Sequence, residues 1–365
     1  MTGRGTVMPM RIVQLTSTSA GGVARHARQV AGLLAEAGEQ VVLAGPPDVV
    51  ADSPVPTAVI DIADRPRRGD VAAIRRLRRL GRSADLVHAH GLRAGAAAVM
   101  ATRALKARPA VVVTLHNLPV GGARVQAVAR ALEVVVARGA DLVLGVSGDL
   151  VARATRLGAQ AARALVPAPE RTSADSDATA GLRAELGLAR EEALVLTVGR
   201  LAPQKGLDLL CDTAAALLRA GAPAFRWVVV GDGPLAEDLR GRVLAEALPV
   251  VVAGRRDDVP ELNRAASVVV STSTWEGQPL AVQEALQAGA AVVATDVGGT
   301  REVTGDAAVL TPPDPGALAA AITGLLTDPD RRERLRVAAR ARADQLPTPA
   351  DVLDQLRSVY AGVRR

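Results

Sequence analysis

Short runs of aliphatic residues, rich in valine, alternate with helical patterns along almost the whole of this chain. Most of the runs show no alternation of apolar and polar residues, which is typical of strands buried on both faces of a parallel sheet. Parallel strands need crossover connections, and helical segments such as 23–37 and 207–220 can supply them. The expected strands are Arg11–Leu15, Gln40–Ala44, Leu86–Ala89, Ala110–Leu115, Leu142–Val146, Ala164–Val166, Leu194–Val198, Arg226–Val230, Val250–Ala253, Ser267–Ser271 and Ala291–Thr295.

A stretch rich in Pro, Ser and Asp, "PAPERTSADSDATAG" at 167–181, divides the strands into two series. A chain of 365 residues is long enough for two domains, each with its own core. The sequence predicts an α/β fold of two doubly wound, Rossmann-like domains facing a cleft, because such sheets bind ligands at the carboxyl ends of their strands. The expected ranges are 1–168 for the first domain, 169–190 for a linker, 191–346 for the second domain and 347–365 for a C-terminal helix that could pack back on the first domain.

Charge is distributed unevenly along the chain. Through Glu170 the sequence holds 22 basic and 12 acidic residues, whereas the remainder holds 22 and 26. A basic first half indicates an anionic partner. Nucleic acid is a poor candidate, because single-strand binders stack bases on aromatic rings and this chain has one Phe, one Tyr and two Trp.

Cysteine content and hydropathy bear on the compartment. Cys211 is the only cysteine, which excludes a disulfide framework and a thiolate metal cluster and fits a reducing cytoplasm. No apolar stretch reaches the roughly 18 residues that span a bilayer. The run Ile12–Leu15 is too short for the apolar part of a signal peptide. We therefore expect a cytoplasmic protein, soluble or held on a surface.

All four histidines, His26, His88, His90 and His116, fall in the first half of the chain. A metal cluster is one interpretation, because imidazole is a common ligand. Neither a His-x-x-x-His helix nor an obvious carboxylate partner accompanies them, so the sequence predicts no metal. His116 follows an expected strand directly and is the better candidate for contact with a substrate.

Two glycine-containing turns and one basic loop follow expected strands. "LTVGRLAPQKGLDLL" presents Arg200 and Lys205 just before a helix, an arrangement that suits a diphosphate, although a solvated surface loop would look the same. "TSTSAGGVARH" places Gly21 and Gly22 before the first helix, and "VVVGDGPL" is a similar turn. Neither a P-loop nor the Gly-x-Gly-x-x-Gly pattern of dinucleotide sites is present.

The segment "STSTWEGQPLAVQEALQAGAAVV" sets Glu276 and Glu284 around a glycine turn and a helix expected to begin at Pro279. A helix N-terminus favours an anion, so two carboxylates there require an explanation. In one interpretation both belong to a binding site. In the other, Glu284 lies with Gln283 and Gln287 on the wet side of an amphipathic helix, and Glu276 is a loop carboxylate. Spacing alone leaves both open.

Taken in order, these motifs together with "VTLHN" and "ATDVGGTREV" resemble the family 4 retaining glycosyltransferases of the GT-B fold, over roughly residues 10 to 345. The resemblance implies a UDP- or GDP-linked sugar as donor, an unidentified acceptor and no metal or other cofactor. It implies catalytic roles for His116, Arg200, Lys205 and Glu276. In the donor site it places Glu276 beside the transferred sugar and Glu284 on the ribose hydroxyls. The backbone of the turn formed by Gly277, Gln278, Pro279 and Leu280 lies near the phosphates. The leaving diphosphate meets Arg200, Lys205 and Gly22, and His116 lies beside the sugar and the acceptor.

Three positions depart from the family pattern. "PAPE" stands where the family has Asn-Gly-Val-Asp, Gln278 replaces an aromatic or aliphatic residue, and the last helix lacks a preceding Trp. None of these removes a catalytic group. Two other functions fit the same architecture, a sugar-nucleotide epimerase and a non-catalytic sugar-nucleotide sensor.

The segment "RPRRGDVAAIRRLRRLGR" at 65–82 predicts an amphipathic basic helix. A solvated surface face and a docking site for anionic lipid both fit this pattern. The helix also resembles one in the phosphatidylinositol mannosyltransferases of the family, which implies a location at the inner membrane face and an acceptor there. The apolar side is formed by Ala73, Ile74, Leu77 and Leu80, and the basic side by Arg75, Arg76, Arg78, Arg79 and Arg82.

Overall fold

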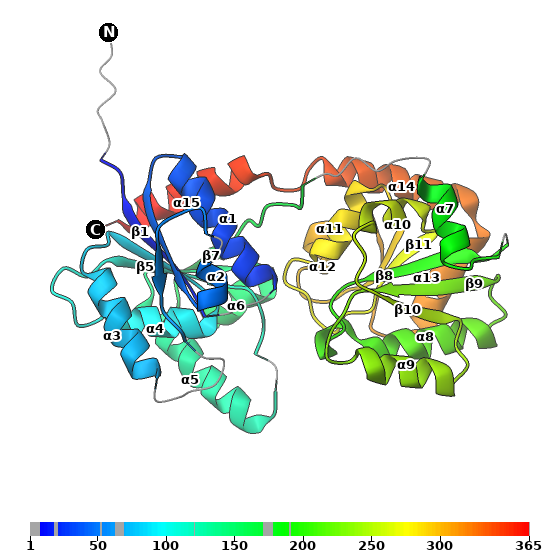
Figure 1. Ribbon diagram of the computed structural model, residues 1–365, viewed down its shortest axis with the longest axis horizontal. Coiled ribbons are helices and arrows are strands. Elements are labelled where there is room, and N and C mark those ends of the chain that lie inside the picture. The colour runs from blue at the N-terminus through cyan, green and yellow to red at the C-terminus, as the bar shows by residue number, and fades with distance from the viewer. Residues whose placement is uncertain are drawn as a thin grey trace, which may run out of the picture. The chain divides into compact units, whose positions relative to one another are not determined.

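A computed structural model describes residues 8–17, 21–51, 53–62, 69–119, 121–170, 178–189 and 191–364 of the chain. These residues form two compact units, each a parallel sheet with helices packed against it (Figure 1). Unit 1 comprises residues 1–167 and 347–365, and unit 2 comprises residues 168–346. The predicted fold class, two doubly wound α/β domains, is confirmed.

Unit 1 contains a seven-stranded parallel sheet in the order β3-β2-β1-β4-β5-β6-β7. The chain first builds outward from β1 to β3 and then returns to the other side of β1, so the order reverses between β1 and β4. The strands are β1 (Arg11–Thr16), β2 (Gln40–Gly45), β3 (Thr57–Val59), β4 (Leu86–His90), β5 (Ala110–Leu115), β6 (Leu142–Gly145) and β7 (Ala161–Arg163). The helices are α1 (Gly22–Glu36), α2 (Pro47–Val50), α3 (Asp70–Gly81), α4 (Leu92–Thr102), α5 (Ala123–Gly139), α6 (Gly148–Arg156) and α15 (Pro349–Val363).

Unit 2 contains a six-stranded parallel sheet in the order β10-β9-β8-β11-β12-β13, which reverses between β8 and β11. Its strands are β8 (Ala193–Val198), β9 (Phe225–Val230), β10 (Val250–Gly254), β11 (Val268–Ser271), β12 (Val292–Thr295) and β13 (Val309–Thr311). Its helices are α7 (Ala178–Glu185), a 3₁₀ turn η1 (Pro203–Lys205), α8 (Leu207–Arg219), α9 (Ala236–Ala245), α10 (Val259–Ala265), α11 (Leu280–Gln287), α12 (Thr300–Thr304), α13 (Pro315–Thr327) and α14 (Pro329–Ala343).

The interior strands match the predictions to within a residue or so at each end, but three short edge strands were missed. β3, β7 and β13 each have three residues, most of them only half-buried, so they lack the continuous apolar run that marks the other strands. The prediction of a strand at Ala164–Val166 is wrong, because β7 ends at Arg163. Half-buried edge strands need less apolar surface than central ones, and periodicity alone therefore does not find them.

The core of unit 2 shows how valine-rich strands are buried on both faces. Val195 of β8 points into one buried cluster and its neighbours Leu194 and Leu196 into another, so both faces of the strand are covered. The buried Trp227 of β9 donates its Nε1–H to Thr197 Oγ1 at 3.0 Å, and the Thr197 hydroxyl donates to the Val270 carbonyl at 2.8 Å. Two adjacent strands and the buried indole are thereby joined, which fixes the register of β8 beside β11.

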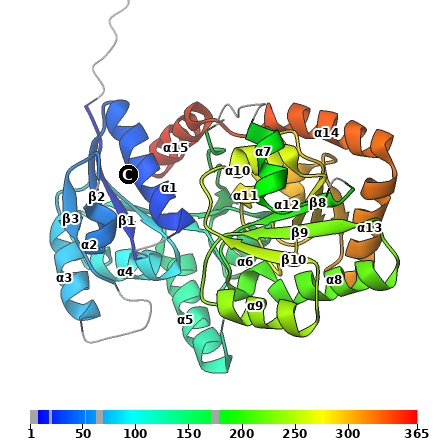
Figure 2. The same cartoon turned by 45° about the vertical axis from the view of Figure 1, so that its right-hand side comes forward.

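The C-terminal helix α15 packs against α1 within unit 1 (Figures 1 and 2). Its buried Tyr360 hydroxyl accepts from Gln14 Nε2 at 3.0 Å and lies 2.7 Å from His88 Nδ1. Gln355 accepts from the Leu165 amide at 2.7 Å. Helix α7 lies inside the segment 169–190 and packs on α10 of unit 2, with Leu182 buried (Figure 2).

Candidate functional site

The carboxyl ends of β8 and β11 border a pocket at the point where the strand order of unit 2 reverses. Open parallel sheets bind ligands at this position because the loops that follow the two strands leave in opposite directions. Most of the lining side chains come from the β8–α8 loop, which carries Arg200 and Lys205, and from the β11–α11 loop, which carries Glu276. The pocket is lined by Thr197, Val198, Gly199, Arg200, Leu201, Lys205, Leu207, Val269, Val270, Ser271, Thr272, Ser273, Glu276, Pro279, Ala281 and Val282.

Close backbone packing explains the Gly-Asp-Gly turn after β9. A Cβ on Gly231, whose φ is +140°, would lie 1.9 Å from the Gly199 carbonyl oxygen, and one on Gly233 would lie 2.3 Å from the Leu201 carbonyl oxygen. The Leu201 amide donates to the Asp232 carbonyl at 2.9 Å. These glycines let the turn support the loop that carries Arg200.

The two cations of the β8–α8 loop lie in different environments. Arg200 is exposed, and its guanidinium makes no hydrogen bond or ion pair with any described residue. Lys205 Nζ lies 2.6 Å from Glu276 Oε1, and the lysine side chain is 26% exposed. Arg200 is therefore available to an incoming anion, whereas Lys205 is already oriented by a carboxylate.

Glu276 is buried and held by several contacts. Its side chain is 6% exposed, and Oε1 also accepts from Ser273 Oγ at 2.6 Å. Its carbonyl oxygen accepts from the Gly299 amide at 2.7 Å. A Cβ on Gly298, whose φ is +52°, would lie 2.0 Å from that same carbonyl oxygen. The loop carboxylate predicted from sequence is thus a fixed acceptor inside the pocket.

Glu284 lies apart from this pocket. It lines a second one between α10 and α11, together with Asn263, Arg264 and Gln287. Gln283, which the solvated-helix interpretation placed on a wet face, is fully buried and donates to Gln278 Oε1 at 3.1 Å. That part of the alternative is wrong, because α11 is covered by unit 2 on the side where Gln283 lies.

The turn before α11 borders the first pocket. Gly277 and Pro279 are buried, and α11 begins at Leu280 with no acidic residue in its first turn. The first amides of a helix have no partner within it, and Ala281 and Val282 of the first turn of α11 line the same pocket as Arg200 and Lys205. An anion at this end of the helix is favoured by both the amides and the two cations.

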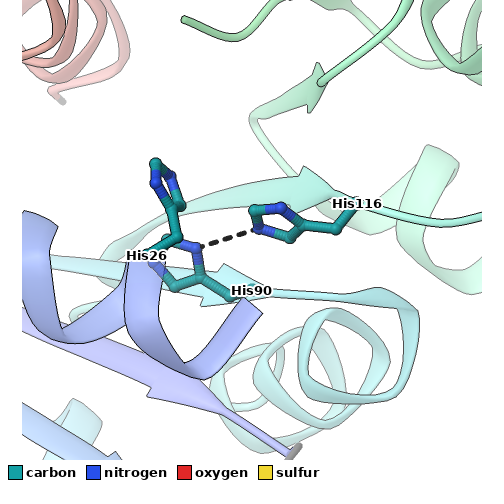
Figure 3. Close-up of side chains that lie close together, drawn as sticks. All are labelled: His26, His90 and His116. Atoms are coloured by element: carbon teal, nitrogen blue, oxygen red, sulfur yellow. Dashed lines mark hydrogen bonds between the residues drawn. The ribbon is translucent and has the colours of Figure 1, made fainter. Parts of the chain in front are cut away.

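In unit 1 the predicted residues lie at the carboxyl edge of the sheet. Gly22 is the exposed first residue of α1, and His116 follows β5 directly and is half-buried. His26, one turn along α1, and His90, at the end of β4, lie against His116, with His90 Nδ1 3.3 Å from His116 Nε2 (Figure 3). Burial lowers the pKa of His26 to about 4 and holds the pKa values of His90 and His116 well below their usual range.

Several positioning residues were not singled out from sequence. Thr272 ties the two loops of unit 2 together, since its Oγ1 donates to the Lys205 carbonyl at 2.9 Å, and Ser273 holds the Glu276 carboxylate. Gln14 binds His90 Nε2 at 2.8 Å in unit 1. Ser, Thr and Gln are common on protein surfaces, so the sequence alone does not identify these residues as part of a site. Gly298, in contrast, lies within "ATDVGGTREV", one of the motifs that carry the family resemblance.

Helix α3 presents the predicted basic face. Ala73 and Leu77 are buried and Ile74 and Leu80 are half-buried, as expected for the packed side. Positions 65–68 of the predicted segment lie outside the described residues. Among the described residues, no helix has both the length and the apolar character needed to cross a membrane. The side chains of Arg75, Arg76, Arg78, Arg79 and Arg82 are exposed.

Comparison with known families agrees with this architecture. Residues 21–169 match the family described as glycosyl transferase 4-like domain, and residues 180–342 match glycosyl transferases group 1. The two matches fall on the two units and together span most of the chain. The fold defines an architecture of two Rossmann-like domains, and the chain belongs to the family 4 glycosyltransferases.

Individual curated relatives agree with this family assignment. The chain is 37% identical over 201 residues to a D-inositol 3-phosphate glycosyltransferase of Thermomonospora curvata, covering 50% of this chain and 46% of that protein. It is 31% identical over 195 residues to the alpha-D-kanosaminyltransferase of Streptomyces kanamyceticus, covering 51% and 50%. The chain thus spans about half the length of these curated relatives.

Solved structures extend the similarity to the whole fold. Anabaena HepE, solved in complex with UDP and glucose, superimposes with a TM-score of 0.81 at 22% identity over 97% of this chain and 100% of that one. The sucrose-phosphate synthase of Thermosynechococcus elongatus gives 0.77 at 24% identity over 97% and 98%. At these identities the likeness establishes the fold, which is GT-B.

Proposed function

We propose that this protein transfers a sugar from a nucleoside diphosphate sugar to a hydroxyl acceptor, with retention of configuration and without a metal ion. The observation that carries the proposal is the pocket at the β8–β11 reversal. Arg200, which has no side-chain partner in the described part of the chain, the oriented Lys205 and the start of α11 all favour an anion there. Family membership and the UDP and glucose complex of HepE support a nucleotide sugar as that anion.

The chemistry follows from where charge develops. The bond between the anomeric carbon and the diphosphate oxygen breaks, and the acceptor oxygen bonds to the same face of that carbon. The acceptor proton passes to the departing phosphate oxygen. Arg200 and Lys205 stabilise the diphosphate as its negative charge grows, a kind of preorganised stabilisation that is worth several kcal/mol in a dry site. These two cations supply the charge that a divalent metal supplies elsewhere.

The remaining roles follow the family motif residue by residue. Glu276 contacts the transferred sugar, and Glu284 bonds the ribose hydroxyls from the second pocket. For unit 1 the family motif assigns Gly22 to the diphosphate and His116 to the sugar and acceptor. The base is uracil or guanine, read mainly through the backbone. The UDP complexes of HepE favour uracil, and the acceptor is a hydroxyl compound.

A screen of nucleotide sugars tests this function. A ligand that binds only the native state raises its melting temperature, so the true donor should shift the unfolding transition while nucleotides with another base do not. In the absence of an acceptor, the enzyme should hydrolyse the donor slowly to free sugar and nucleoside diphosphate. Conversion of donor alone to a different sugar nucleotide would instead indicate an epimerase, and binding without turnover over a broad acceptor panel would indicate a sensor.

The two glutamates should differ in which kinetic constant they affect. Glu284→Gln should weaken donor binding, because a neutral amide accepts the ribose hydroxyl protons less strongly than a carboxylate. Glu276→Gln should lower kcat more than it raises KM, because the residue lies beside the reacting sugar and orients Lys205 at 2.6 Å. Donor titration by calorimetry and steady-state kinetics separate the two effects.

Unchanged donor affinity and rate in both glutamate variants, with the melting temperature retained, would rule out the donor-site roles of Glu276 and Glu284.

The basic face of α3 supports a location on anionic membrane surfaces at the inner face of the cell membrane, with a lipid-linked or otherwise membrane-presented acceptor. We expect the protein to cosediment with vesicles containing anionic lipid and not with neutral ones, because each exposed basic residue near such a surface contributes about 1 kcal/mol. Added salt should weaken the binding. Binding should fall when Arg75, Arg76, Arg78 and Arg79 are changed to Ser.

The matched control removes the same charge from unit 2. If α3 is the docking face, changing four exposed arginines elsewhere should leave sedimentation nearly unchanged. Equal loss in both variants would indicate only a net-charge effect, and equal binding to neutral and anionic vesicles would remove the membrane from the proposal. The control set is Arg219, Arg331, Arg334 and Arg340 to Ser.

A further inference from the structure

Three of the four histidines of the chain meet at one point of unit 1. His26 comes from α1, His90 from the end of β4 and His116 from the residue after β5 (Figure 3). One ring nitrogen from each lies within 4.8 Å of those of the other two. His26 and His116 are 90 residues apart in the sequence, so no local spacing motif predicts that they lie together.

We propose that His26, His90 and His116 form a binding site for a transition-metal ion such as Zn²⁺, and that occupancy of this site inhibits the enzyme. Two nitrogens bound to a tetrahedral zinc at about 2.0–2.1 Å lie roughly 3.3–3.4 Å apart. The observed separation between His90 Nδ1 and His116 Nε2 is 3.3 Å. The pair therefore needs little movement to bind one ion.

The hydrogen bonds behind His90 present its Nδ1 lone pair to the site. Gln14 Nε2 donates to the Tyr360 hydroxyl at 3.0 Å, which turns the Gln14 carbonyl oxygen toward His90. That oxygen lies 2.8 Å from His90 Nε2 and can only accept, so His90 carries its proton on Nε2. In metal sites, a histidine that binds the ion commonly donates its other ring N–H to a carbonyl oxygen.

His26 adds an independent observation. Its ring is 7% exposed, and its Nδ1 is buried with no hydrogen-bond partner among the described residues. A buried polar atom without a partner costs free energy, and such an atom in a ring that packs against the rings of His90 and His116 is explained if it binds a ligand.

The ligand set selects the class of ion. Three imidazoles without a carboxylate suit Zn²⁺, Co²⁺, Ni²⁺ or Cu²⁺, whereas Mg²⁺ and Ca²⁺ prefer oxygen. The single cysteine, Cys211, is buried in α8 of unit 2 and is not a member of the group. Three protein ligands leave a position open for water, as in catalytic zinc sites, although the proposed reaction makes no use of it.

Inhibition rests on the role proposed for His116 at the sugar and acceptor. A metal ion would hold the His116 ring against His90 and occupy His116 Nε2, so that the ring could not turn toward a substrate. Transfer should therefore proceed in the presence of a chelator, fall when Zn²⁺ is added in excess over the chelator, and recover when chelator is restored.

Metal binding is tested directly, without donor or acceptor. Untagged, chelator-stripped protein is titrated with Co²⁺ and followed by visible absorption, and with Zn²⁺ by calorimetry. We expect one ion per chain and the intense absorption of tetrahedral Co²⁺. His26→Leu should abolish this signal while retaining the fold, because an apolar side chain of similar size replaces an unpartnered buried polar group. Gln14→Leu should weaken affinity by about 10- to 100-fold.

His88→Gln is the matched control, since it removes the histidine that is not in the group and should retain binding. X-ray absorption of the zinc-loaded wild type should report three imidazole ligands, and this measurement does not depend on any variant folding. Absence of saturable binding, or equal binding by His26→Leu, would overturn the proposal. Because binding is measured without turnover, such a result would leave the proposed transferase function standing, and loss of turnover alone would leave the metal site standing.

Discussion

Arg200→Ala is expected to lower kcat at least a hundredfold while leaving the melting temperature unchanged. The guanidinium is exposed and has no partner among the described residues, so its removal breaks no contact of the folded protein. Loss of one preorganised group that stabilises developing charge typically costs a factor of roughly 100 to 1,000 in kcat. Steady-state kinetics and thermal unfolding of the same preparation measure both quantities.

Lys205→Ala should cause a similar kinetic loss but should also destabilise unit 2. Glu276 is only 6% exposed, and without Lys205 its carboxylate would keep the Ser273 hydroxyl as its remaining side-chain partner. The double variant Lys205→Ala with Glu276→Gln should regain stability without regaining activity. Full activity of Arg200→Ala and Lys205→Ala, or complete loss of wild-type activity on chelation, would refute the proposed mechanism.

Gly206→Ala should destabilise unit 2 by roughly 3 kcal/mol or more and abolish transfer, because the new methyl group has no space. Gly206 has a φ of +60°, and a Cβ there would lie 2.1 Å from the Thr272 carbonyl oxygen. Backbone atoms cannot move aside as a flexible side chain can. The β8–α8 loop would have to separate from the β11–α11 loop, which would break the Lys205–Glu276 pair.

Gly221→Ala at the other end of α8 is the matched control. Gly221 has nearly the same φ, +64°, but nothing lies within 4 Å of its Cβ position. It should cost only the conformational penalty of about 1 kcal/mol and retain activity. Chemical denaturation measures both costs. Equal destabilisation by the two substitutions would show that the contact between the loops contributes nothing beyond backbone conformation.

Local patterning was sufficient for the strands and for the order of the motifs. A valine-rich strand such as β5 is buried at every position and almost wholly apolar, because both of its faces are covered. The glycine turns and the Arg200–Lys205 loop were likewise visible, because their residue types follow directly from what a turn or an anion requires. The roles of Glu276 and Glu284 could not be predicted from spacing, and only the family resemblance assigned them to the donor site.

Only the tertiary structure decided which of these residues meet. β8 and β11 are separated in sequence by two further strands, yet they are neighbours in the sheet, and their pairing brings Lys205 Nζ to 2.6 Å from Glu276 Oε1. The same kind of non-sequential pairing sets β1 beside β4 and gathers His26, His90 and His116. The period of a sequence reports which face of an element is buried. The distance between side chains on different elements depends on strand order and register, which are set by packing across the whole sheet, and no local spacing encodes them.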